Sequence, residues 1–158
     1  MTNEPPRIAK VIAPPPVLFV GTLLVALLVD RLVWRMPLGL PDAPRYGIGG
    51  ILVLLGTVLL FLAATSFARA GTGVRHAAGS SALVTSGLHV FTRNPMYLGM
   101  ALAFSGLALL ADSLVTLLAL APILLVVQFG VIAIEERFME AKFGDDYRAY
   151  KKRVRPWI

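Results

Sequence analysis

Long apolar runs separated by short polar segments form the dominant pattern of this chain. Residues 46–68, 95–111 and 114–134 are runs of 23, 17 and 21 residues without a charged side chain. A membrane-spanning helix takes about 20 apolar residues at 1.5 Å rise per residue, so the 17-residue run is close to the lower limit. The pattern therefore predicts three membrane-spanning helices within residues 46–134.

A further apolar run near the N-terminus covers residues 17–34. It carries no charge before Asp30 and follows three prolines at positions 14–16, which cannot lie in a helix interior. Basic residues before an apolar core are also typical of a cleaved signal peptide, but no small-x-small cleavage site follows Val29. We expect a retained helix, which brings the predicted number of transmembrane helices to about four.

The segments between these helices predict how they are connected. Only Asp112 and Ser113 separate the third and fourth runs, which indicates a tight antiparallel helical hairpin. Residues 66–94 are polar and rich in glycine and serine, and residues 135–158 hold seven Lys or Arg and five Asp or Glu. We predict a single all-α, polytopic membrane domain with two N-terminal spans in residues 1–65, a cytoplasmic connecting segment in 66–94, the hairpin in 95–134 and a tail in 135–158.

Composition and charge support a membrane protein. Of 158 residues, 57% are hydrophobic and 15% charged, whereas soluble domains carry about 25% charged residues. The lack of cysteine excludes a disulfide scaffold, a thiolate zinc site and a cysteine nucleophile. A net charge of +6 on a soluble chain would suggest nucleic acid. Here the charges lie between apolar runs, so the expected partner is an anionic membrane surface and not nucleic acid.

The distribution of basic residues predicts the orientation. Lys and Arg number seven in the tail, three in residues 69–93 and two before residue 17, and an even number of spans places all of them on one side. Three arginines, at positions 31, 35 and 45, fall on the other side. Because basic segments remain in the cytoplasm, both termini are predicted to be cytoplasmic, in the cell membrane of a bacterium or archaeon.

The hairpin places two polar groups at one depth. Asn94 lies 19 residues before Ser113, and Glu135 lies 22 residues after it. On antiparallel helices of equal rise, both positions reach the cytoplasmic end within about one helical turn of each other. One pocket at the membrane boundary is therefore expected to contain Arg93, Asn94, Tyr97, Glu135 and Glu136.

The acidic pair has a structural and a functional interpretation. Glu135 and Glu136 close an apolar run and can form a solvated helix end. Carboxylates at a helix C-terminus oppose the helix dipole, however, and they also oppose the excess of basic residues on that side. A bound cation or a set of hydroxyl donors would explain their position.

The start of the third helix also has two interpretations. In the structural one, Asn94 caps the helix, Pro95 occupies its first position, Arg93 snorkels toward solvent and Tyr97 joins an aromatic belt at the membrane interface. In the functional one, the exposed N–H groups of this helix start bind an anion such as a cofactor carboxylate.

The tail is predicted to contain two helical pieces. Residues 135–143 continue the fourth helix, Gly144 stops it, and a second helix follows. Phe143, Tyr147, Tyr150 and Val154 form one apolar face with basic residues around it. An interfacial helix on anionic lipid explains this pattern, and a lid over a site is compatible with it.

No metal site is predicted. His76 and His89 lie thirteen residues apart in the connecting segment, and the chain contains no HxxxH or HExxH motif. The glycines at positions 47, 49 and 50 lack the third glycine of a GxGxxG motif, and inside an apolar run they are typical of close helix packing.

Four motifs in a fixed order resemble one family. They are LVTSG at residues 83–87, RNPMYLG at residues 93–99, the pair Glu135 and Glu136, and FGDDYRAYKKRV at residues 143–154. Each motif alone is weak. Their order, with a helical hairpin in the middle, strongly resembles the integral-membrane methyltransferases over residues 67–155. These are the isoprenylcysteine carboxyl methyltransferases and the related phospholipid N-methyltransferases.

The resemblance implies S-adenosylmethionine as cofactor, with S-adenosylhomocysteine as product, bound by the C-terminal half without a Rossmann domain. Glu135, Glu136 and Arg93 are implied as catalytic residues. Val131 stands where the eukaryotic prenylcysteine enzymes carry an arginine, which argues against a prenylcysteine substrate. By position, the implied cofactor-binding residues are Leu83, Val84, His89, Asn94 (a histidine in many relatives), Pro95, Met96, Tyr97 and Glu135.

The implied reaction is methyl transfer to a lipophilic small molecule or lipid at the cytoplasmic membrane face. A carboxylate acceptor needs no base, whereas an amine must lose a proton, to Glu135 or Glu136. A small transporter or accessory subunit is the alternative, but it would need ionisable groups deep in the spans, where Gln128 and a few hydroxyl groups are the polar side chains. A catalytically inactive relative is the third hypothesis, against which the intact motifs argue.

Overall fold

The computed structural model describes residues 12–69 and 83–158, and within these residues it contains helices and turns but no strand. The predicted all-α class is confirmed. Residues 1–11 and 70–82, which hold part of the predicted connecting segment and His76, lie outside the described residues. The elements in chain order are α1 (Pro15–Leu32), α2 (Asp42–Arg69), the short turn η2 (Gly87–Val90), α3 (Pro95–Leu110), α4 (Leu114–Val127), the π-helical segment η3 (Gln128–Ile132) and α5 (Ala133–Arg153).

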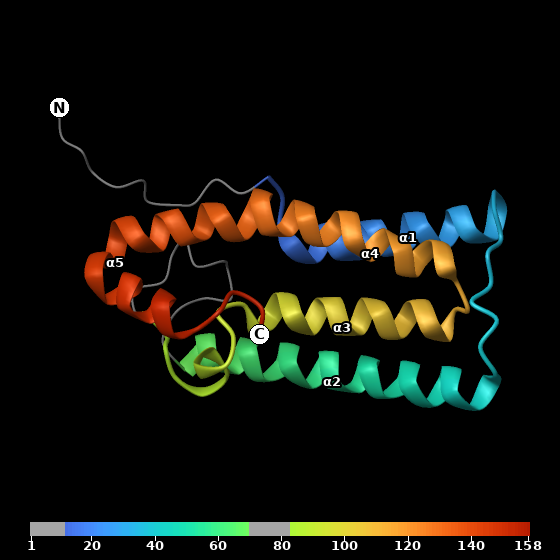
Figure 1. Ribbon diagram of the computed structural model, residues 1–158, viewed down its shortest axis with the longest axis horizontal. Coiled ribbons are helices and arrows are strands. Elements are labelled where there is room, and N and C mark those ends of the chain that lie inside the picture. The colour runs from blue at the N-terminus through green and yellow to red at the C-terminus, as the bar shows by residue number, and fades with distance from the viewer. Residues whose placement is uncertain (1–11, 70–82) are drawn as a thin grey trace.

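Three helical stretches are individually long and apolar enough to cross a membrane. They are Pro15–Leu32, Asp42–Ser66 and the helical stretch Leu114–Arg153, which bends at Gly144. The fourth apolar helix, α3, is shorter and has 16 residues. Figure 1 shows an elongated bundle in which the α1–α2 and α3–α4 connections lie at one end, while α5 extends beyond the other end. The predicted polytopic arrangement with a helical hairpin of α3 and α4 is confirmed.

Helices α2 and α3 approach each other through glycines. A Cβ atom on Gly56 would lie 2.6 Å from the carbonyl oxygen of Gly99, and one on Gly106 would lie 2.6 Å from that of Gly49. These distances leave no room for a side chain, and small residues permit such close contact between helices in membranes. The predicted packing role is confirmed for Gly49, whereas the other two glycines of its cluster face open space.

Substituting Gly106 by alanine is expected to destabilise the protein by about 2 kcal/mol, because the added methyl group overpacks the interface. It would meet the carbonyl oxygen of Gly49 and, at 2.8 Å, the backbone nitrogen of Val53, so α2 and α3 would have to separate. Thermal unfolding in detergent measures the effect. Gly50→Ala is the control, since its Cβ atom would meet nothing within 4 Å. Equal melting temperatures for the two variants would contradict the backbone contact.

An ionic cluster around the buried Asp30 closes the end of the bundle that lies away from α5. Asp30 is fully buried and accepts hydrogen bonds from the Arg35 side chain and the Met36 amide. Asp112, in the α3–α4 turn, lies 3.4 Å from Arg35 and 3.5 Å from Arg45. Both arginines fall on the side where few basic residues are expected. The aspartates that pair with them explain how that side accommodates their charge.

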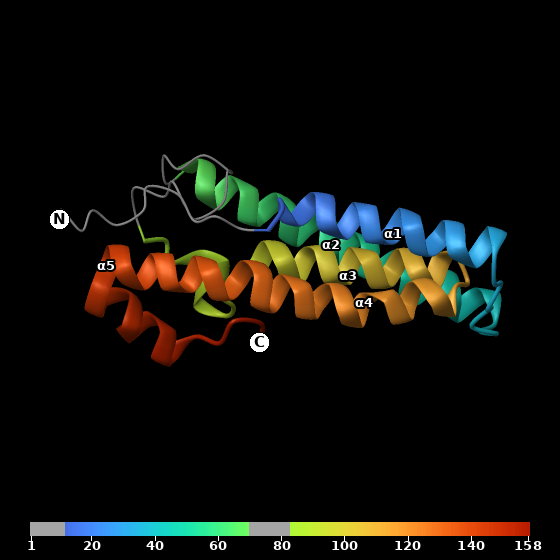
Figure 2. The same cartoon turned by 90° about the horizontal axis from the view of Figure 1, so that it is seen from above.

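The tail folds back at a glycine. Within α5, Gly144 has φ 55° and ψ −125°, a conformation that residues with a side chain rarely adopt. The predicted break at Gly144 is confirmed, and Figure 2 shows the chain after it turning back beside the bundle. Tyr147, Tyr150 and Val154 of the predicted apolar face are buried in one cluster with Phe138. This face therefore packs on the protein itself rather than on lipid.

Candidate active site

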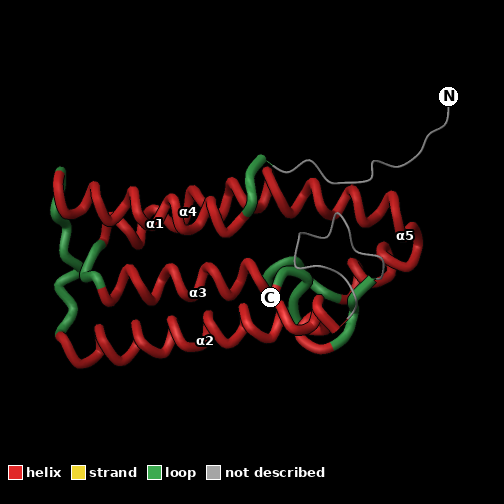
Figure 3. The backbone as a smooth tube through the Cα atoms, turned by 180° about the vertical axis from the view of Figure 1, so that it is seen from behind, coloured by secondary structure: helices red, strands yellow, loops and turns green. Residues whose placement is uncertain are grey.

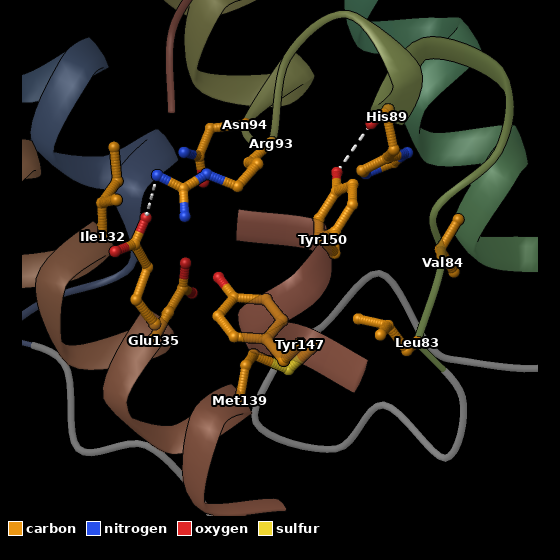
Figure 4. Close-up of a pocket in the computed structure, with 11 residues that line it drawn as sticks. Leu83, Val84, His89, Arg93, Asn94, Ile132, Glu135, Met139, Tyr147 and Tyr150 are labelled. Atoms are coloured by element: carbon orange, nitrogen blue, oxygen red, sulfur yellow. Dashed lines mark hydrogen bonds and ion pairs between the residues drawn. The ribbon is translucent and has the colours of Figure 1, made fainter. Parts of the chain in front are cut away.

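A pocket lies where the ends of the helical hairpin meet the folded-back tail (Figure 4). The space between its walls, including the part open to solvent, is about 500 Å³. Its walls come from residues 83–94, the end of η3, the first turns of α5 and the part of α5 after Gly144. The lining residues are Leu83, Val84, His89, Arg93, Asn94, Ile132, Glu135, Glu136, Met139, Tyr147 and Tyr150.

Residues from the two ends of the hairpin meet in this pocket. Arg93 Nη2 lies 3.0 Å from Glu136 Oε1, and the Tyr97 hydroxyl group donates to the Glu135 carboxyl group at 2.9 and 3.1 Å. The predicted common depth of these residues is confirmed. Its cause is the short turn at Asp112, which holds α3 and α4 antiparallel and in a fixed register.

Glu135 and Tyr97 are buried against each other. Each is 7% exposed, so neither side chain lies in solvent or at the lipid surface. The interpretations of Glu135 as a solvated helix end and of Tyr97 as part of an aromatic belt are therefore wrong. The start of α3 turns Tyr97 toward α5, where its hydroxyl group provides the polar partner that a buried carboxyl group requires.

Arg93 is the buried cation of the pocket. Its side chain is 7% exposed and pairs with Glu136, so the structural interpretation, in which it snorkels toward solvent, is wrong. Lys151 lies 3.1 Å from the other oxygen of Glu136. The Nε and Nη1 atoms of Arg93 are buried without a hydrogen-bond partner in the described part of the chain. Because buried N–H groups are rarely left unpaired, these atoms indicate a place where an anion fits.

The start of α3 binds the C-terminus of the chain. Asn94 occupies the N-cap position, but its side chain makes no capping bond and donates to the Pro156 carbonyl at 2.9 Å. The Thr92 hydroxyl group also donates to the Pro156 carbonyl, at 3.1 Å, and accepts from the backbone N–H of Asn94. The predicted side-chain cap is therefore wrong, because the C-terminus takes the Asn94 side chain. Pro95 in the first turn of α3 is confirmed.

Further hydrogen bonds hold the folded-back tail against the segment before α3. The Arg93 amide donates to the Arg155 carbonyl at 3.0 Å, and the Tyr150 hydroxyl group donates to the His89 carbonyl at 2.7 Å. Figure 3 shows the C-terminus beside the start of α3. The tail is therefore a wall of the pocket, as the interpretation of its apolar face as a lid requires.

Burial and pairing determine the charge of several groups around the pocket. Burial lowers the pKa of His89, so its imidazole is neutral at physiological pH. Burial raises the pKa of Tyr150 to about 12, so its hydroxyl group keeps the proton that it donates. The bond to Glu140 raises the pKa of Lys151, which therefore stays cationic beside the acidic pair.

A known protein family matches most of this architecture. The family described as phospholipid methyltransferase matches residues 44–146, a stretch that includes α3, α4 and the acidic pair of the pocket. The chain belongs to this family. The resemblance indicated by the four motifs is thereby confirmed.

Two relatives of this phospholipid methyltransferase family member match parts of its sequence. An uncharacterized protein of Haemophilus influenzae is 45% identical over 64 residues, which are 40% of this chain and 100% of that protein. Methanethiol S-methyltransferase 1 of Bradyrhizobium diazoefficiens is 38% identical over 73 residues, which are 44% of this chain and 25% of that protein. The family and the second relative agree on methyl transfer as the class of reaction.

The pocket of this phospholipid methyltransferase family member contains most of the residues predicted for it. Leu83, Val84, His89 and Asn94 line it, together with the three residues implied as catalytic. The structure does not place Pro95, Met96 and Tyr97 among the lining residues. Met96 packs against the core of the bundle, and Tyr97 reaches the site through Glu135. The roles of all these residues in binding and catalysis stay predictions.

Four lining residues were not predicted. Ile132 and Met139 lie three residues before and four residues after Glu135, so helical spacing alone could have found them. Tyr147 and Tyr150 belong to the predicted apolar face, but only the bend at Gly144 brings that face over the pocket. Within residues 12–69 and 83–158, no group of three or more His, Asp or Glu side chains is arranged to hold a metal ion.

Proposed function

We propose that the protein transfers a methyl group from S-adenosylmethionine to a lipophilic acceptor at the cytoplasmic face of the membrane. The observation that carries this proposal is Arg93, whose buried and unpartnered N–H groups share one pocket with Glu135 and Glu136. Membership of a methyltransferase family supports the class of reaction.

The side chains of the pocket fit the parts of this cofactor. Its amino acid end carries a carboxylate and an ammonium group, its ribose carries hydroxyl groups, and its sulfonium is a cation. The unpartnered N–H groups of Arg93 suit the carboxylate, while Glu135 and Glu136 suit the ammonium or the hydroxyl groups. Tyrosine rings suit the sulfonium, and Leu83 and Met139 offer apolar surface to the adenine. When bound, the cofactor supplies an electrophilic methyl group.

The residues of the chain then have three tasks, namely to align the reactants, to exclude water and, for some acceptors, to remove a proton. The folded-back tail, with Tyr147 and Tyr150 buried, covers the pocket and limits access of water. For an amine acceptor, an oxygen of Glu135 or Glu136 takes the proton and frees the lone pair of the nitrogen. A carboxylate or thiolate acceptor already has a free lone pair and needs no such base.

A thiol is a second candidate acceptor, favoured by the relative whose name states methanethiol. Val131 is fully buried. Its hydrocarbon side chain offers no cation at the position where the prenylcysteine enzymes carry an arginine. An amine or a thiol fits these observations better than a prenylcysteine carboxylate.

The proposed orientation places the pocket at the cytoplasmic surface of a bacterial or archaeal cell membrane. Lys152, Arg153 and Arg155 are exposed on the tail that covers the pocket. Basic residues in this position would contact anionic lipid headgroups, and their excess on one side supports a cytoplasmic location.

Binding of S-adenosylhomocysteine to the purified protein in detergent tests the proposed function. Calorimetry is expected to show saturable binding with one site per chain, and a lack of binding even at millimolar ligand would contradict the proposal. Mass spectrometry of lipids and thiols from cells with and without the protein is expected to identify the acceptor by an added CH₂. A transporter would instead show substrate flux in proteoliposomes without S-adenosylmethionine.

A further inference from the structure

Three buried tyrosines surround the acidic pair, and their hydroxyl groups have different partners. The Tyr97 hydroxyl group donates to Glu135, and the Tyr150 hydroxyl group donates to the His89 carbonyl. Tyr147 is 5% exposed and lines the pocket. Its hydroxyl group interacts with Arg93, whose guanidinium group can only donate, so the hydroxyl oxygen is the acceptor in that contact. The contact with Arg93 therefore does not use the proton of the Tyr147 hydroxyl group, which can be donated to a ligand in the pocket.

The hydroxyl group of Tyr147 faces the charged centre of the pocket. Figure 4 shows it pointing toward the space between Arg93 and Glu135. Burial and the charge of Glu136 raise the pKa of Tyr147, while Arg93 acts in the opposite direction, so the hydroxyl group stays protonated. The donor of Tyr147 and the two unpartnered nitrogens of Arg93 thus lie in the same part of the pocket.

We propose that Tyr147 and Arg93 together form a carboxylate-binding subsite, in which Tyr147 is a specificity-determining residue supplied by the folded-back tail. This inference rests on the proposed function. A carboxylate has two oxygens and can accept from a guanidinium and a phenol at once. The neighbouring Glu135 and Glu136 disfavour a dianion such as phosphate, because like charges repel strongly in a buried site.

Two ligands of a methyltransferase can supply this carboxylate, namely the amino acid end of the cofactor and a carboxylate acceptor. In both cases the subsite is complete only while the tail is folded back, because Tyr147 follows Gly144 whereas Arg93 precedes α3. The preference for a carboxylate ligand therefore depends on tail closure.

Tyr147→Phe removes the hydroxyl group and retains the ring that packs 6.1 Å from Tyr150, measured between centroids. Calorimetry compares S-adenosylhomocysteine with its decarboxylated analogue. The ratio of their Kd values, which is the preference for the carboxylate, is expected to fall about 10-fold, since one hydrogen bond to a charged group is lost. A packing defect would weaken both ligands alike and leave the ratio unchanged. The matched control is Tyr46→Phe, which is expected to leave the ratio unchanged. Tyr46 is 54% exposed and lies near the start of α2, at the end of the bundle away from the pocket.

A second measurement covers an acceptor carboxylate. Palmitate serves as the probe for a lipophilic carboxylate acceptor and is added to protein saturated with S-adenosylhomocysteine. If the acceptor supplies the carboxylate, Tyr147→Phe is expected to weaken palmitate binding and to leave the Kd ratio of S-adenosylhomocysteine and its decarboxylated analogue unchanged. The subsite would be overturned by one combination of results. The ratio of the two Kd values would be the same in the wild type and Tyr147→Phe, and palmitate would bind both proteins equally or bind neither. Failure of the proposed function is a different result, because the wild-type protein would then bind neither S-adenosylhomocysteine nor its decarboxylated analogue.

Discussion

Glu135→Gln is expected to weaken S-adenosylhomocysteine binding by about 100-fold while the fold is retained. Glutamine has nearly the same shape, and its amide oxygen can still accept from the Tyr97 hydroxyl group, which lies 2.9 Å from the carboxyl group. The substitution removes the negative charge and replaces one acceptor oxygen by a donor NH₂ group, in a side chain that is 7% exposed. Truncating one partner of a buried, charged hydrogen bond costs about 2–5 kcal/mol, which corresponds to a loss between roughly 30-fold and 5,000-fold and includes the expected value.

Calorimetry on the purified variants measures this loss, with Glu140→Gln as the matched control. The Glu140 side chain is 33% exposed, pairs with Lys151 at 2.7 Å and does not line the pocket. Pairs exposed to this extent contribute at most about 1 kcal/mol, so the control is expected to bind almost as tightly as the wild type. Equal affinities for the two variants would exclude Glu135 from the cofactor site.

The depth of the site could be predicted from the sequence, but the directions of its side chains could not. Counting from Ser113 places Asn94 and Glu135 at one level, because the rise of a helix is constant. The direction of a side chain around the helix axis depends on how α3 and α5 pack, which the count does not contain. For this reason the sequence left two interpretations open for Arg93 and Tyr97, one in which they face solvent and lipid and one in which they face the pocket. In the structure both point inward.

The contact between α2 and α3 could be predicted from the spacing of their glycines, but only by comparing the two helices. Gly49 and Gly56 are seven residues apart, and so are Gly99 and Gly106. Seven residues make about two helical turns, so each pair lies on one face of its helix. Antiparallel helices then match the first glycine of one pair with the second glycine of the other, as the structure shows.

The bend of the tail could be predicted at Gly144, but its direction could not. A glycine between two helical patterns indicates a break, and it permits several directions. The direction is stabilised by hydrogen bonds from Thr92 and Asn94 to Pro156, which join residues more than 60 positions apart. No local pattern encodes such a pairing. The part of the pocket that comes from Tyr147 was therefore missing from the prediction.

Gly144→Val is expected to release the tail from the bundle. A β-branched residue at φ 55° and ψ −125° is strained by about 3 kcal/mol. An added Cβ atom would meet nothing within 4 Å, so backbone strain is the main effect. Opening of the tail should become roughly 100-fold more favourable. Hydrogen exchange at the Arg93 amide, which donates to Arg155, is expected to lose protection by the same factor.

Gly47→Val separates this strain from the general effect of an added side chain. Gly47 lies in α2, and an added Cβ atom there also meets nothing within 4 Å, so the tail is expected to exchange as in the wild type. If Gly144→Val loses affinity for S-adenosylhomocysteine together with protection, the pocket binds its ligand only when the tail covers it, because Tyr147 moves away with the tail. A Gly144→Val variant that kept both protection and affinity would show that the conformation of Gly144 does not hold the tail closed.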